Sequence, residues 1–149
     1  DAWMAEPKYF DKDHWHETEV FRNAHVKEEY DWVTGELDRL LSQPDMEETG
    51  FVYRAVAPNE DTIVLFCHFG VECVLLSHLL NISPMQLWHG TCAAPSSVTV
   101  LYTEERRSGV ASFRMSSFGD VSHLYAGGRE PSFAARFCEV YTRFDQRHD

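Results

Sequence analysis

The chain has 149 residues, of which 44% are hydrophobic and 13% aromatic, and its formal net charge is −11 at pH 7. This length and composition suit one folded domain with a sizeable core and exclude a disordered chain. The negative charge argues against a nucleic-acid or anionic-membrane partner, but it allows a small anionic substrate in a local pocket.

The apolar runs and the cysteines indicate where the protein resides. No apolar run reaches the roughly 18 to 20 residues needed to span a bilayer. The first 17 residues are polar and aromatic, and they lack the pattern of a secretory signal peptide. The cysteines form no Cys-x-x-Cys pair, and two of them lie in apolar runs: Cys67, Cys73, Cys92 and Cys138. We therefore expect reduced thiols and a cytoplasmic protein.

The first third of the chain predicts an irregular segment, a helix and a strand. Residues 1–20 show no clear periodicity and are rich in aromatic and charged side chains. Residues 24–42 place apolar side chains at helical spacing, with Pro44 just beyond, which predicts an amphipathic helix. Residues 50–56 alternate as in a strand, and the turn formers of residues 57–61 follow.

The central stretch, TIVLFCHFGVECVLLSHLL at residues 62–80, joins two apolar elements through one histidine. The β-branched and apolar residues 62–67 predict a strand covered on both faces, as in a parallel sheet. Residues 70–80 are apolar nearly all round, which predicts a buried helix. A strand followed at once by a helix indicates an α/β fold.

The remaining elements are predicted from local signals. Residues 83–89 predict a short helix, with Ser83 as its cap and Pro84 at its first position. Residues 97–117 predict a hairpin whose charged turn ends at Gly109. Residues 131–144 predict a last helix.

His68 is the best candidate functional residue because it stands where the predicted strand ends and the helix begins. Ligand crevices in open α/β sheets lie outside the carboxyl ends of strands. A helix N-terminus attracts anions, and Gly70 lets the backbone turn tightly and an anion approach. We expect the His68 imidazole and the amides of Phe69 and Gly70 to hold one phosphoryl group. A structural core histidine is the alternative.

Other common motifs are absent from the sequence. No cysteine is followed, after five residues, by arginine, and there is no Gly-x-Ser-x-Gly, Walker-type or Gly-x-Gly-x-x-Gly motif. His14 and His16 lie close together, but two histidines in a polar stretch are weak evidence, and we expect no metal. We expect His78 to be a packed or partly exposed helix residue.

Three stretches together resemble the histidine phosphatase superfamily, the phosphoglycerate-mutase-like proteins. Residues 62–80 resemble its second histidine block, in which a hydrophobic strand ends in His-x-Gly and an apolar helix follows. Residues 94–101, APSSVTVL, resemble its small-residue turn into a late strand. Residues 118–124, FGDVSHL, resemble its closing segment, often written N-D-T-x-H-L, with Gly119 in place of asparagine. The order and spacing of the three stretches fit the family.

The resemblance implies a three-layer α/β/α fold and phosphoryl transfer or phosphomonoester hydrolysis, with no metal or organic cofactor. In the family, a first histidine within Arg-His-Gly becomes a phosphohistidine, and the second stabilises the transferring group. A carboxylic acid protonates the leaving oxygen. Only the second histidine maps onto this chain, at His68, with the backbone amide of Phe69 as a phosphate contact.

The nucleophile block of the family is missing from this sequence. It contains no Arg-His-Gly triplet, and its only Arg-His pair is Arg147–His148. We therefore expect residues 1–149 to be the C-terminal part of one histidine phosphatase domain, inactive by itself, with a sheet that lacks its first strand. Self-association through the exposed sheet edge would follow. A phosphatase is favoured over a mutase because long mutase-type insertions are not evident.

Two alternatives to an enzyme part stay open at this point. One is a non-catalytic phosphate-binding or regulatory module without a nucleophile, and the other is an acidic α/β domain in which His68 is structural. If the chain is part of an enzyme, its partner is a small phosphorylated substrate. Its specificity would come from an aromatic rim made of Tyr9, Phe10, Trp15 and His16, although these residues equally suit a loop packed by its own aromatics.

Overall fold

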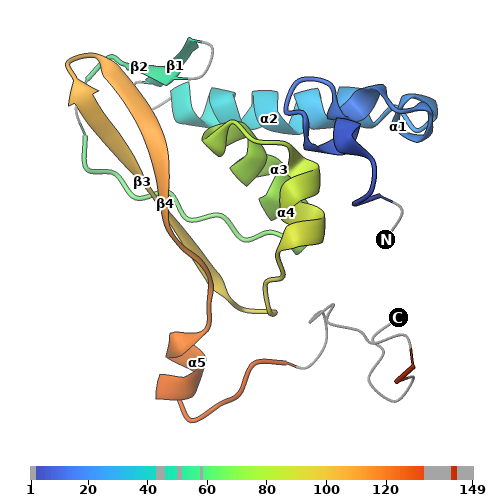
Figure 1. The fold of residues 1–149 in the computed structure, drawn as a ribbon. Helices are drawn as coiled ribbons and strands as arrows, with labels where there is room; N and C mark the ends of the chain where they lie inside the picture. The colour runs from blue at the N-terminus through green and yellow to red at the C-terminus, as the bar shows by residue number, and fades with distance from the viewer. Residues whose placement is uncertain (1–2, 43–45, 50–51, 58, 133–141, 144–149) are drawn as a thin grey trace.

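The computed structural model describes residues 3–42, 46–49, 52–57, 59–132 and 142–143 (Figure 1). Helices and strands alternate irregularly, and the helices outnumber the strands in the first two thirds of the chain. In chain order the elements are the 3₁₀ helices η1 (Pro7–Phe10) and η2 (Trp15–Glu17), then α1 (Glu19–Asn23), α2 (Val26–Ser42), β1 (Met46–Thr49), β2 (Val52–Ala55), α3 (Phe69–Leu80), α4 (Pro84–Gly90), β3 (Val98–Arg107), β4 (Val110–Asp120) and α5 (Ser122–Ala126).

The four described strands form one antiparallel sheet in the order β1-β2-β4-β3. Its main part is the long β3–β4 hairpin, which turns at Gly109, whose φ of +78° suits glycine. The short β2 pairs with the start of β4, where Tyr53 lies opposite Ala111. The general α/β class is therefore confirmed, as a mixture of helices with a small antiparallel sheet.

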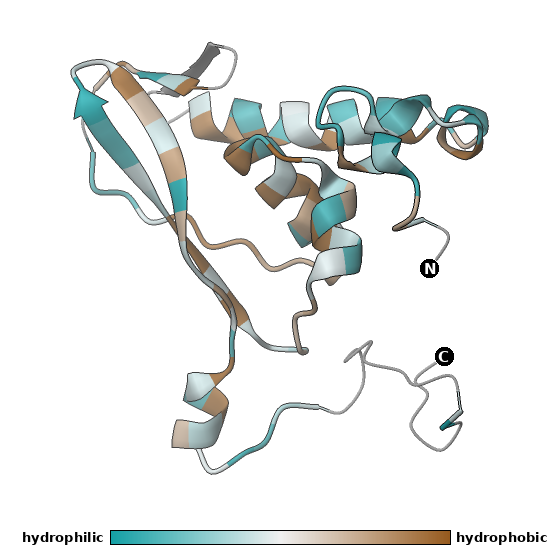
Figure 2. Ribbon diagram, viewed as in Figure 1, coloured by the Kyte–Doolittle hydropathy of each residue, from teal (hydrophilic) through white to brown (hydrophobic). Residues whose placement is uncertain are grey.

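Helices α2, α3 and α4 pack beside the hairpin, and α3 is apolar along most of its length (Figures 1 and 2). Cys73 and Leu76 of α3 are buried with Leu87 of α4. Partly buried side chains of the hairpin pack against them: Leu101, Met115 and Phe118. The helix ends at Asn81, which adopts the left-handed conformation that commonly terminates helices.

A second core joins α2 to the sheet, and an aromatic one holds the N-terminal segment. Leu37 and Leu41 of α2 pack with Tyr53 and Ala111. The N-terminal cluster contains Tyr9, Trp15, Phe21 and Met85, all buried. Residues 3–20, predicted to be irregular, are thus ordered by their aromatic side chains around two short 3₁₀ helices.

Most local predictions are confirmed. The helix predicted at residues 24–42 is α2, and the hairpin predicted at residues 97–117 is β3–β4. Ser83 caps α4 as predicted, because its hydroxyl accepts a hydrogen bond from the Met85 N–H at 3.2 Å. Of the helix predicted at residues 131–144, positions 133–141 and 144 lie outside the described residues.

The prediction of a buried central strand at residues 62–67 is wrong. Residues 59–68 form neither helix nor strand, and they lead as an irregular coil into α3 (Figure 1). Four consecutive apolar side chains are exposed, by 43% at Ile63, 67% at Val64, 48% at Leu65 and 97% at Phe66. A central strand needs a neighbour on each side and cover on each face. The described strands pair with one another and provide neither to this run.

Candidate functional site

His68 stands at the N-cap of α3, so the predicted helix start directly after this histidine is confirmed. Its backbone is extended, with φ −89° and ψ 156°, and its carbonyl oxygen accepts the first hydrogen bond of the helix, from the Glu72 N–H at 3.0 Å. The imidazole makes no capping hydrogen bond and is exposed to solvent. His68 is therefore not a buried core histidine, and the interpretation of His68 as a structural core residue is excluded.

The first turn of α3 has the geometry expected of an anion site. In an α-helix the first backbone N–H groups have no acceptor within the helix. Gly70 is exposed, and a Cβ added to it would meet no atom within 4 Å. Its conformation is helical, so the sequence-based idea that Gly70 permits a tight turn is wrong. What this glycine provides is open space over the backbone of the helix start.

A hydrogen-bonded link joins the first turn of α3 to both strands of the hairpin. The Thr99 hydroxyl of β3 donates to the Glu72 carboxylate at 2.5 Å, and the Gly119 N–H of β4 donates to the same hydroxyl at 3.1 Å. Glu72, Thr99 and Gly119 come from the three separate stretches at residues 62–80, 94–101 and 118–124. The fold thus brings these three stretches together within one turn of His68.

Gly119 lies in the left-handed region, with φ +63°, and a Cβ added to it would lie 3.6 Å from Ala93. Glycine adopts this conformation freely, and asparagine adopts it more readily than most other residues do. The glycine at position 119 therefore suits the backbone conformation of this segment. The side-chain amide of asparagine is what this chain lacks.

The cysteines beside the site are protonated thiols. Burial raises the pKa of Cys73 to about 12, and the charge of Glu72 adds to that effect. Cys67 precedes His68 and is exposed as a residue, yet partial desolvation of its thiol, followed by the charge of Glu72, also raises its pKa. Both thiols are thus less reactive at neutral pH than an ordinary cysteine, because the reactive species is the thiolate.

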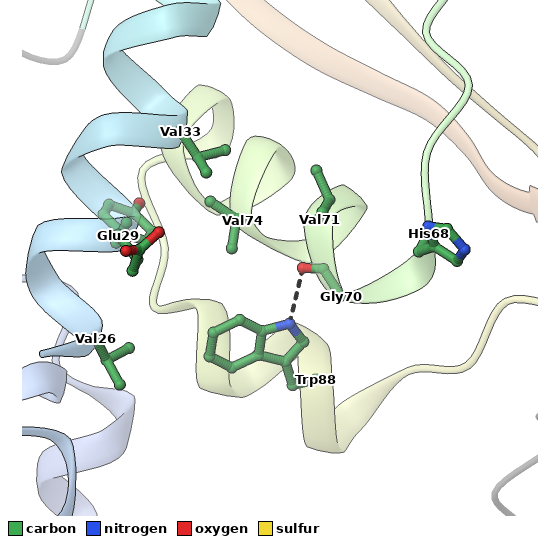
Figure 3. Close-up of a pocket in the computed structure, with 9 residues that line it drawn as sticks. Val26, Glu29, Val33, His68, Gly70, Val71, Val74 and Trp88 are labelled. Atoms are coloured by element: carbon green, nitrogen blue, oxygen red, sulfur yellow. Dashed lines mark hydrogen bonds between the residues drawn. The ribbon is translucent and has the colours of Figure 1, made fainter. Parts of the chain in front are cut away.

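A mostly apolar groove of about 380 Å³ runs from His68 between α2, α3 and α4 (Figure 3). His68 lies at one end, while Val26, Glu29 and Val33 of α2 line the opposite wall. The remaining lining residues come from α2, α3 and α4: Tyr30, Gly70, Val71, Val74 and Trp88. The indole N–H of Trp88 donates to the Gly70 carbonyl oxygen at 3.1 Å, which fixes α4 to the helix start.

The aromatic rim predicted from the sequence does not line this groove. Tyr9 and Trp15 are buried, 6% and 2% exposed, in the N-terminal cluster, and His16 packs edge-on against Trp15 with ring centroids 5.7 Å apart. Phe10 is partly buried and is likewise not among the groove residues. The interpretation of this segment as a loop packed by its aromatics is confirmed for Tyr9 and Trp15. The spacing of Val26, Tyr30 and Val33, one helical face, was the available signal for the groove.

Two further histidines, His78 and His14, each contact an aspartate side chain. His78 is largely buried, as expected, with its Nε2 atom 2.9 Å from both carboxylate oxygens of Asp38, and the Tyr53 hydroxyl donates to Asp38 at 2.8 Å. His14 lies 3.0 Å from Asp11, and that hydrogen bond raises the pKa of the fully exposed His14. Among the described residues, no three His, Cys, Asp or Glu side chains are grouped as metal ligands.

Comparisons with protein-family models, curated proteins and solved structures find no match. Among the helices that the structure describes, none has the length and apolar character required to cross a membrane. The functional conclusion therefore depends on the site and on the resemblance of the three stretches.

Proposed function

We propose that this chain is the part of a phosphomonoester hydrolase that holds the transferring phosphoryl group, in an enzyme that acts through a phosphohistidine. The His68 imidazole donates hydrogen bonds to the phosphoryl oxygens and, when protonated, neutralises part of their charge. The backbone N–H groups of Phe69 and Gly70 contact the same oxygens at the helix N-terminus. No Arg-His-Gly triplet is present, so the attacking histidine is not in this sequence.

The link from Glu72 through Thr99 to Gly119 is the observation that carries this proposal. The three stretches lie side by side because β3 and β4 form one hairpin and α3 packs against it, and this arrangement is the one that three parts of one active site require. Here the three stretches that resemble the family converge at the first turn of the helix that His68 caps. The side chain of His68 is exposed and makes no capping hydrogen bond, so it is accessible to a ligand.

The groove beside His68 supports a substrate with an apolar body. Its lining includes the side chains of Val33, Val71 and Val74, and its ionisable side chains are those of Glu29, Tyr30 and His68. A phosphomonoester with its phosphate at His68 would place an aliphatic or aromatic group along the valines. Glu29 would disfavour a second anionic group at the far end.

The proposal includes a three-layer α/β/α sheet in a longer protein, which supplies the attacking histidine next to His68. In this chain residues 62–67 are exposed coil, and their composition suits a strand only where another backbone pairs with them.

A non-catalytic phosphate-binding module is the second candidate, and the missing Arg-His-Gly triplet favours it for this chain by itself. Both candidates require phosphate at His68, and they differ in turnover. Binding to a helix N-terminus and one imidazole should be weak, with a dissociation constant on the order of 1 mM.

A phosphomonoesterase assay on two chains tests the proposal. The 149-residue chain should release no phosphate, because it holds no nucleophile of this kind, while a protein extended upstream through an Arg-His-Gly segment should do so. In that longer protein His68→Ala should lower the rate by roughly 10² to 10³, the usual effect of removing one stabilising donor. The matched control His25→Asn changes an exposed histidine at the start of α2 and should leave the rate unchanged.

Equal turnover by the short chain and the longer protein would refute the division of the site between two parts of the enzyme. An unchanged rate in the longer His68→Ala variant would refute the role of His68. If no upstream extension contains Arg-His-Gly while phosphate binding persists, the non-catalytic module is the correct function.

A further inference from the structure

Residues 62–67 present an apolar surface and an unused backbone at the same place. Phe66 is almost fully exposed and Val64 is two-thirds exposed. Within the described part of the chain, the backbone of residues 62–67 makes no hydrogen bond. Free N–H and C=O groups next to β-branched and apolar side chains are a template for strand pairing.

We propose that two copies of this chain associate through residues 62–67, which pair antiparallel across a two-fold axis between Val64 and Leu65. Such an interface is self-complementary, because the same segment contributes both halves. In this register Val64 lies opposite the partner's Leu65, and Ile63 lies opposite the partner's Phe66. An aromatic side chain opposite a β-branched one is among the favourable cross-strand pairs.

The charges that flank the segment favour this register and this occupant. The six residues carry no formal charge, so pairing brings no like charges together within the strand. One residue beyond each end, Asp61 lies opposite the partner's His68. Both residues are exposed, and each two-fold pair would contain this contact twice. An acidic group thus meets a histidine at both ends of the strand, which is the charge complementarity expected of a specific pair.

The free edge of β3 is a poorer partner for this segment. The β3–β4 ladder shifts register between Val98 and Leu101, and such irregularities increase the local twist of the edge. Further along β3, Glu104 forms ion pairs with Arg106 of the same strand and with Arg114 of β4. Charged side chains also protect an edge from pairing. A second copy of residues 62–67 has neither a register irregularity nor a charged side chain in the segment that would pair.

The dimer should be weak, and larger oligomers should not form. Six residues bury less surface than a standard interface, which is typical of weak and transient contacts. Each chain carries a net charge of −11, and this repulsion opposes larger assemblies. The inference is independent of phosphate binding, although both concern His68, so association is measured without phosphate.

Sedimentation equilibrium of the full chain over about a hundredfold range of concentration tests the proposal. The chain should convert from monomer to dimer, and Phe66→Glu should weaken the association at least tenfold, the effect expected from losing one buried aromatic side chain. Trp32→Glu is the matched control, because Trp32 is 65% exposed on α2 and gains the same charge. It should leave the dimer unchanged. A chain that stays monomeric, or a Phe66→Glu variant that dimerises like the parent, overturns the proposal.

The register is tested by oxidation of a Thr62→Cys variant. In the proposed pair this position lies opposite the native Cys67 of the partner, so mild oxidation should give a covalent dimer with a 62–67 linkage in peptide mass spectra. Asn59→Cys, three residues earlier, should not form this linkage. A charge exchange gives independent support: Asp61→Arg should weaken association, and adding His68→Asp should restore it. Failure of both the linkage and the restoration would refute this register.

Discussion

His68 contributes to α3 through its backbone, and this leaves the imidazole unused by the fold. The carbonyl oxygen begins the helix, while the side chain makes no capping bond. The sequence could predict this position, because a helix start is encoded by residues next to one another. It could not predict the link between Glu72 and Thr99, which are far apart in the chain and meet only in the folded structure.

The variant Gly70→Ala distinguishes the effect of Gly70 on helix stability from its effect on phosphate binding. We expect it to raise the free energy of unfolding by up to about 0.5 to 1 kcal/mol, because Gly70 is helical and alanine is the better helix former. The added methyl group meets no protein atom. It would narrow the approach to the backbone amides, so phosphate affinity should fall several-fold. Chemical denaturation and a phosphate titration measure the two effects.

A loss of stability in Gly70→Ala would contradict the described helical conformation. Unchanged phosphate affinity would remove Gly70 from the list of phosphate contacts, while leaving the role of His68 to be tested separately.

At the scale of elements, Asp38 connects α2 to both α3 and β2. It accepts a hydrogen bond from Tyr53 and lies 2.9 Å from His78, and the Asp38 and His78 side chains are less than one-fifth exposed. We expect Asp38→Ala to lower the free energy of unfolding by roughly 2 to 3 kcal/mol, because it leaves two buried partners unsatisfied. Tyr53→Phe removes one hydrogen bond and should cost about 1 kcal/mol.

Urea denaturation of the two variants provides the comparison. Equal losses in Asp38→Ala and Tyr53→Phe would show that the contact between His78 and Asp38 contributes nothing to the packing of α3 on α2.

The end of β4 contains a carboxylate whose ionisation holds the start of α5. The Ser122 N–H and hydroxyl both donate to Asp120, and these bonds lower the pKa of Asp120 below its ordinary value of 3.8. A lowered pKa means that the interaction is complete above the ordinary Asp range and is lost as the pH falls through the lower folded value. The Ser122 amide resonance should therefore titrate with a midpoint below 3.8.

The variant Asp120→Asn should abolish that transition in an NMR pH titration. Persistence of the transition in Asp120→Asn, or a midpoint above the ordinary Asp value, would show that Asp120 does not hold Ser122.

The elements that could be predicted from sequence are those that local signals determine. The amphipathic spacing of α2, the Ser83–Pro84 start of α4 and the Gly109 turn each depend on neighbouring residues. The strand predicted at residues 62–67 does not form, because a strand depends on a pairing partner and not on neighbouring residues alone. The composition of residues 62–67 favours a strand, but a strand forms only where another backbone pairs with it, and no described strand does so.

At the scale of the whole molecule, the helices and hairpin form three cores while one apolar run stays exposed. Its exposure is the observation on which the proposed pairing with a second copy depends. The groove could not be predicted because α2, α3 and α4 line it together, and their packing is not encoded in any one segment.

The central claim is that His68 and the first turn of α3 bind a phosphoryl group. The most direct test is an NMR titration of the 149-residue chain with inorganic phosphate, with the imidazole signals of all eight histidines followed at constant pH and ionic strength. We expect the His68 signals and the Gly70 amide signal to shift together and to saturate in the millimolar range, with His25 unaffected. His68→Asn should weaken the response of the Gly70 amide. Saturation at another histidine, or no response at His68 and Gly70, would contradict the account.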